Sequence, residues 1–69
     1  MKKYWYAAQR NNEDTEWGTG SFDYGEAVKK AKEFGDESQI AVIDGGYDED
    51  GNETTEPICV EVYRNGEDF

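Results

Sequence analysis

The stretch Phe-Asp-Tyr-Gly-Glu-Ala-Val-Lys-Lys-Ala-Lys-Glu-Phe-Gly, residues 22–35, decides the fold because it carries both ends of one helix. Asp23 followed by Glu26 matches a capping box, which bonds the free N–H groups of a first helical turn. Gly35 is a typical C-terminal cap. The pattern predicts a helix over residues 24–34. Its buried stripe is predicted to be Tyr24, Ala27, Val28, Ala31 and Phe34.

Strand-forming segments flank this helix on both sides. Residues 3–10 and 14–19 predict a hairpin before the helix, with its turn at Asn11 and Asn12. Residues 39–44 follow the helix and are apolar on both faces, which is typical of a central strand. These segments place two strands before the helix and at least one after it.

The last strand is predicted over residues 57–63, because Pro57 suits the first position of a strand. Alternation along it places Ile58, Val60 and Val62 towards the core, and Cys59, Glu61 and Tyr63 away from it. Residues 65–69 are expected to form a short tail. The whole pattern predicts a single α+β domain over residues 1–69, with the order ββαββ and an antiparallel sheet that packs one helix on one face.

Catalysis is poorly supported by the residue types present. The chain has no histidine, so His-based triads and His metal sites are excluded. Cys59, the single cysteine, has no imidazole to activate it. A carboxyl that works as a general acid needs a raised pKa, usually in an apolar pocket, whereas most carboxylates here fall in a polar segment. We therefore predict a protein that is not an enzyme and has no cofactor.

The charge is concentrated in one half of the chain. Residues 1–35 hold six acidic and six basic residues, and residues 36–69 hold eleven acidic residues and one basic residue, which accounts for the net charge of −10. This asymmetry indicates an electrostatic role, although excess carboxylate also serves solubility. Direct binding to nucleic acid is excluded, because the basic cluster of Lys29, Lys30 and Lys32 is too small to offset −10.

The acidic residues gather around one predicted hairpin between the last two strands. Its turn signal lies at residues 49–52. We expect a basic protein partner to contact this hairpin and the strand that follows it. The candidate partner-binding residues are Asp44, Tyr47, Asp48, Glu49, Asp50, Glu53, Glu56 and Glu61.

A calcium loop is the alternative interpretation of this segment. If Gly51 takes the glycine position of an EF-hand loop, Asp48 and Asp50 fall on ligand positions, but Gly46 and Pro57 fall on the two essential end positions. We therefore predict a solvated hairpin and no metal site, with weak calcium binding left open. No apolar run reaches the roughly 18 residues of a membrane span, and no signal-peptide pattern is present, so a cytoplasmic protein without a membrane partner is expected.

In its size, acidity and α+β pattern, the chain resembles the small inhibitor proteins of phages and mobile elements, of the anti-CRISPR or DNA-mimic type. This resemblance covers the whole chain and implies an inhibitor that docks on a basic nucleic-acid-binding protein or nuclease complex. The alternative is a structural or regulatory protein-interaction domain, monomeric or homodimeric, whose acidity only serves solubility. An enzyme or metal-dependent protein is the third and least supported class.

Overall fold

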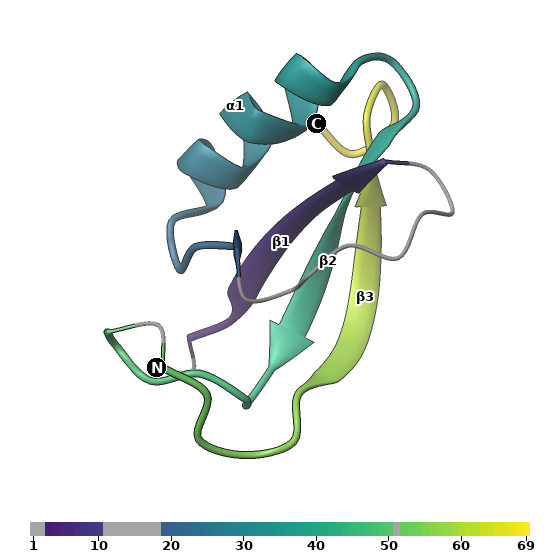
Figure 1. Cartoon of the computed structure of the whole chain (residues 1–69). Coiled ribbons are helices and arrows are strands. Elements are labelled where there is room, and N and C mark those ends of the chain that lie inside the picture. Colours follow the sequence, from purple (N-terminus) through teal and green to yellow (C-terminus); the bar gives the residue numbers. More distant parts are fainter. Residues whose placement is uncertain (1–2, 11–18, 51) are drawn as a thin grey trace.

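A computed structural model describes residues 3–10, 19–50 and 52–69. Within these residues the elements are, in chain order, β1 (Trp5–Arg10), α1 (Tyr24–Phe34), β2 (Ser38–Asp44) and β3 (Ile58–Arg64). The strands form one antiparallel sheet with β2 in the centre. The helix α1 lies on one face of the sheet, over β1 and β2 (Figure 1). The predicted α+β class and the central position of the strand after the helix are confirmed.

The strand predicted over residues 14–19 lies outside the described residues except for Thr19. Where the described chain resumes, Ser21 forms an antiparallel bridge with Tyr6 of β1. Each of these residues donates its N–H to the carbonyl oxygen of the other, at 2.7 and 2.9 Å. The backbone therefore returns antiparallel to β1 just before α1 begins.

The helix α1 has the bounds that its caps predict. Asp23 Oδ1 accepts hydrogen bonds from the first turn, at 2.9 Å from the N–H of Gly25. The N–H of Asp23, which a complete capping box would bond to Glu26, donates instead to Ser21 Oγ at 3.0 Å. Gly35 ends the helix as predicted. Only half of the predicted capping box is therefore formed.

The sheet is apolar on both faces, and alanine supplies much of the buried surface. The fully buried cluster on the α1 side consists of Ala8, Ala27, Ala31 and Ile40. The cluster on the opposite side consists of Trp5, Ala7, Ala41 and Ile43. Alanine lets the helix and strands approach closely, so the core is thin, as expected for a chain of this length.

The predicted facing of the last strand is wrong. Ile58, Val60 and Val62 were expected to face the core, but their side chains are 62%, 52% and 38% exposed. Tyr63, expected to face away, packs against the α1-side cluster. One reason for this exposure is that α1 packs on β1 and β2 and does not cover β3 (Figure 1).

A β-bulge in β3 is the second reason. Glu61 pairs with Val42 and Cys59 pairs with Ile43, so Val60 between them has no partner in β2. One extra residue shifts every side chain beyond it to the other face. Simple alternation along this strand therefore fails.

Residues 65–69 form a turn and not the expected tail. Asp68 Oδ2 accepts a hydrogen bond from the N–H of Arg64 at 2.9 Å. Asn65 Nδ2 donates to the carbonyl oxygen of Gly35 at 3.0 Å, which ties this turn to the end of α1. Phe69 packs against the α1-side cluster.

Candidate functional site

The segment that carries most predicted site residues is residues 44–56, here called the acidic loop, which joins β2 to β3. It folds back on itself as a small hairpin. Tyr47 and Glu53 form an antiparallel bridge, and the N–H of Asp48 donates to the carbonyl oxygen of Asn52 at 2.9 Å. The predicted turn at the tip of this segment is thus confirmed for its described residues.

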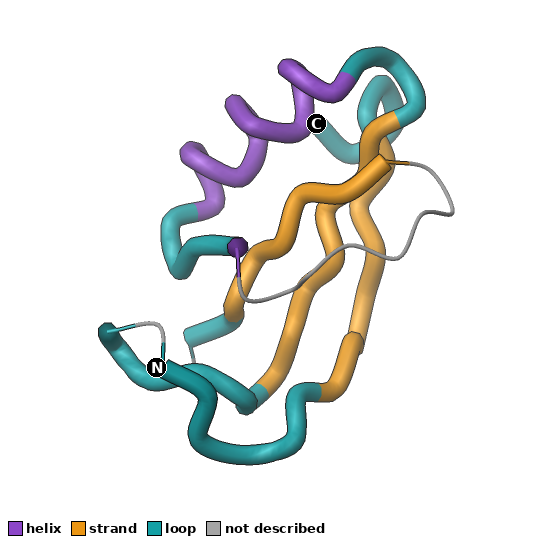
Figure 2. The backbone as a smooth tube through the Cα atoms, viewed as in Figure 1, coloured by secondary structure: helices purple, strands orange, loops and turns teal. Residues whose placement is uncertain are grey.

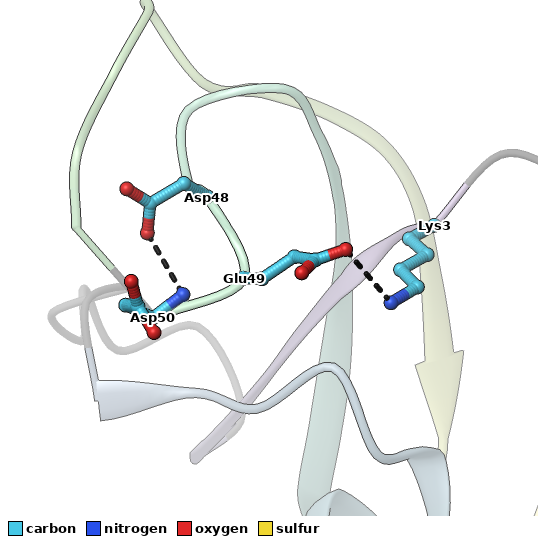
Figure 3. A network of polar contacts seen from close by, with 4 residues as sticks. All are labelled: Lys3, Asp48, Glu49 and Asp50. Atoms are coloured by element: carbon cyan, nitrogen blue, oxygen red, sulfur yellow. Dashed lines mark hydrogen bonds and ion pairs between the residues drawn. The ribbon is translucent and has the colours of Figure 1, made fainter.

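Asp48 holds the turn together with its side chain. Its Oδ1 accepts a hydrogen bond from the N–H of Asp50 at 2.9 Å (Figure 3). It accepts a second one from the N–H of Asn52, also at 2.9 Å. Aspartate favours turns because its carboxylate bonds the backbone a few residues further on. One carboxylate oxygen of this predicted partner-binding residue is therefore engaged within the acidic loop.

Tyr47 anchors the acidic loop to the body of the domain. Its ring stacks on Trp5 with centroids 4.5 Å apart and an interplanar angle of 22°. Phe22 meets the same indole edge-on, at 4.9 Å and 83°. Partial burial, together with the negative charge of Glu53, raises the pKa of the Tyr47 phenol above its usual value. This predicted contact residue is half-buried, and much of its ring is used inside the protein.

The base of the acidic loop is fixed by Gly46. This residue is buried, and its N–H donates to Thr55 Oγ1 at 2.9 Å. Its carbonyl oxygen accepts from the N–H of Thr54 at 2.8 Å. The loop is thus braced at its tip, along its length and at its base.

Of the remaining carboxylates of the acidic loop, that of Asp44 is half-buried at the end of β2, and the others point to solvent. Glu49 Oε1 lies 3.5 Å from Lys3 Nζ (Figure 3), but these side chains are 85% and 66% exposed. Surface pairs of this kind contribute less than about 1 kcal/mol. Asp50, Glu53 and Glu56 are also exposed.

Glu61 is separated from the other predicted site residues. It lies on β3 and pairs with Val42, on the sheet face that α1 covers in part. After partial burial, its negative charge is the next cause of the raised pKa of the Tyr63 phenol. The structure therefore brings the other seven predicted residues together in the acidic loop and leaves Glu61 outside it.

A second group of carboxylates, missed by sequence reasoning, lies on two turns at the end of the sheet opposite the acidic loop; Figure 2 shows the backbone of these turns. It combines the turn between α1 and β2 with the C-terminal turn, segments that are far apart in the chain. We call it the distal acidic group. It consists of Asp36, Glu37, Glu67 and Asp68. The acidity of residues 36–69 is thus divided between two ends of a molecule that measures 32 × 23 × 18 Å.

Other kinds of site find little support in the described residues. Within residues 3–10, 19–50 and 52–69, no three Cys, Asp or Glu side chains are grouped so as to hold a metal ion. In the same part of the chain, no helix has the length and apolarity needed to cross a membrane. No protein family, curated protein or solved structure matches this chain. Its function must therefore be inferred from the fold and from the charge it presents.

Proposed function

We propose that the protein is a non-catalytic binding protein that docks through its acidic loop on a basic partner, namely a nucleic-acid-binding protein or nuclease complex. The observation that supports this best is the bracing of the loop, which presents Glu49, Asp50, Glu53 and Glu56 on a hairpin held at tip and base. A preorganised surface loses less conformational entropy on binding than a mobile one. A braced loop backbone therefore leaves more of the electrostatic attraction of these carboxylates available for affinity.

The charge density of the domain is of the right order to compete with nucleic acid. Ten net negative charges over the 32 Å long axis give about 0.31 charges per Å. Duplex DNA carries one charge per about 1.7 Å, or about 0.59 per Å. The domain thus reaches roughly half the charge density of DNA, and a basic groove would attract it over a Debye length.

The proposed setting is the cytoplasm, where inhibitors of the anti-CRISPR or DNA-mimic type act. Occupation of a basic groove would exclude nucleic acid from it. Inhibition then needs no chemistry from the bound protein, in keeping with the expectation that it is not an enzyme. The inhibited partner would recover activity when the domain dissociates.

Salt dependence tests this proposal. The immobilised domain is exposed to host lysate at 0.1 M salt, where the Debye length is about 10 Å, and at 1 M salt, where it is about 3 Å. We expect a nucleic-acid-binding protein to be captured at low salt, reduced at least about tenfold at high salt, and displaced by added duplex DNA. Capture that is indifferent to salt and DNA would contradict docking on a basic groove.

A second candidate function is favoured by the exposed apolar residues of β3. Ile58, Val60 and Val62 lie on a strand at one edge of the sheet, and no described residue pairs with its outer side. An open strand edge can pair with another chain. The protein could then be a homodimeric interaction domain whose acidity only serves solubility.

Light scattering separates these two functions. The docking proposal predicts a mass of 7.9 kDa at all concentrations. The second candidate predicts a mass that rises towards twice this value with concentration. In that case Val60→Lys should restore the monomer, because it places a charge on the exposed edge strand.

A further inference from the structure

Three tyrosine side chains from three different elements line one shallow hollow on the α1 side of the sheet. They come from β1, from the first residue of α1 and from β3, and Asp68 completes the lining. The Tyr24 ring stands between the other two. Its centroid lies 5.2 Å from that of Tyr6 with an interplanar angle of 68°, and 5.8 Å from that of Tyr63 with an angle of 90°.

The hollow exists because α1 covers β1 and β2 but leaves β3 uncovered. Near the start of the helix, the rings of Tyr24 and Tyr63 meet across the gap between α1 and the edge strand. All three tyrosines are half-buried, so each ring is held by packing and still partly open to solvent. In each T-shaped pair the edge of one ring meets the face of the other, so the three rings are set at large angles to one another around the hollow.

The charge around the hollow is negative. Asp68 lines it, and its carboxylate is held in place by the hydrogen bond from the N–H of Arg64. Partial burial, followed by the negative charge of Glu61, raises the pKa of the Tyr63 phenol above its usual value. The pairing of Arg64 with Gln39 places the Arg64 side chain on the other face of the sheet. None of the described residues that line it is basic.

We propose that this tyrosine hollow, lined by Tyr6, Tyr24, Tyr63 and Asp68, binds the guanidinium group of an arginine side chain from the basic partner. The inference rests on the proposed function, since it names the chemistry of that partner. A guanidinium stacks on aromatic faces and also forms forked hydrogen bonds to carboxylates. The compact ammonium of lysine does not offer the same planar match.

The protein already uses the same contact elsewhere. The guanidinium carbon of Arg10 lies 5.7 Å from the centroid of the Phe34 ring, on the same face of the sheet. Phenylalanine lacks the hydroxyl of tyrosine, and this pair has one ring where the hollow offers three. The tyrosine hollow thus offers a guanidinium more aromatic surface than the Arg10–Phe34 pair does.

A small probe tests the hollow without any partner protein. N-acetyl-arginine methylamide is titrated into the whole chain, and the ring resonances of Tyr6, Tyr24 and Tyr63 are followed by NMR. We expect saturable shifts confined to these rings and their neighbours. The matched citrulline derivative, which has the same shape without the charge, should bind at least about tenfold more weakly. Equal binding of citrulline, or of the lysine derivative, would overturn the assignment to a guanidinium.

Variants locate the binding in the hollow. Tyr24→Leu removes one ring face and keeps apolar bulk, whereas Asp68→Asn removes the charge and keeps an acceptor for the N–H of Arg64. Each should weaken arginine binding at least about fivefold, with unfolding followed by circular dichroism to confirm that the fold persists. Glu33→Gln, at an exposed position of α1 outside both the hollow and the acidic loop, removes one negative charge as the control and should leave binding unchanged.

These outcomes separate the hollow from the acidic loop. If arginine binds the wild type, Tyr24→Leu and Asp68→Asn with equal affinity, the hollow is not the site and the inference is wrong. Failure of the acidic loop to capture a basic protein leaves this titration untouched, because the probe needs neither the loop nor a partner. The two proposals can thus fail independently.

Discussion

Replacing Gly46 by alanine is expected to lower the free energy of unfolding by about 2–5 kcal/mol. Gly46 is buried and has a φ of 81°, in the left-handed region where a Cβ costs about 1–2 kcal/mol. A Cβ at this position would also lie 2.5 Å from Pro57 Cβ and 3.0 Å from Pro57 Cα. Overpacking against a rigid ring costs about 1–3 kcal/mol more. For a chain of this size the melting temperature should fall by at least about 8 °C.

Gly66→Ala is the matched control for this prediction. Gly66 has a similar φ of 87°, but no heavy atom of the described residues lies within 4 Å of the position its Cβ would take. It therefore reports the backbone cost alone, about 1–2 kcal/mol. Thermal unfolding of the two variants side by side should show the larger loss for Gly46→Ala. Equal losses would mean that the contact with Pro57 does not constrain the base of the acidic loop.

The parts of the fold that depend on local signals were predictable from the sequence. Asp23 and Gly35 mark the ends of α1 through contacts within a few residues, so the bounds of the helix were correct. The central position of β2 followed from its apolar residues on both faces. Capping residues, and a run of apolar residues buried on both faces of a sheet, can be recognised from the sequence alone.

The facing of β3 could not be predicted, because its causes are not local. The bulge at Val60 is defined by pairing with β2, and the exposure of Ile58 depends on how far α1 extends across the sheet. Alternate residues of a strand lie on the same face of the sheet only if the pairing register is unbroken. Nothing within residues 57–63 marks the extra residue.

The candidate site was predictable in position but not in the role of each residue. The acidic loop was found from its turn residues and charge. That Asp48 bonds the turn could have been suspected from the preference of aspartate for turns. That Tyr47 stacks on Trp5 could not, because the two residues lie 42 positions apart in the chain. The same holds for the tyrosine hollow, which three separate elements build.

Reversing the charge of the acidic loop is the prediction with the largest expected effect on binding. In the variant Glu49→Lys, Asp50→Lys and Glu53→Lys, three exposed side chains change sign, and the net charge rises from −10 to −4. Asp48 is left intact because its carboxylate holds the turn. Like charges placed against a basic surface cost several kcal/mol. We expect affinity for the partner to fall on the order of 100-fold, or about 2.8 kcal/mol at about 1.4 kcal/mol per tenfold.

The distal acidic group supplies a control of equal charge. Asp36→Lys, Glu37→Lys and Glu67→Lys also change the net charge from −10 to −4, at the other end of the sheet. All three side chains are exposed. A loss of affinity that follows net charge alone would appear in both variants, whereas docking through the acidic loop would spare the distal variant.

The most direct test of the account is the capture of host proteins by three immobilised baits, namely the wild type, the loop-reversed variant and the distal-reversed variant. The bound proteins are quantified by mass spectrometry at 0.1 M salt, where exposed charges still act over about 10 Å. We predict that the wild type and the distal variant retain the same nucleic-acid-binding protein and that the loop-reversed variant loses it. Equal retention by all three baits, or equal loss from both variants, would contradict docking through the acidic loop.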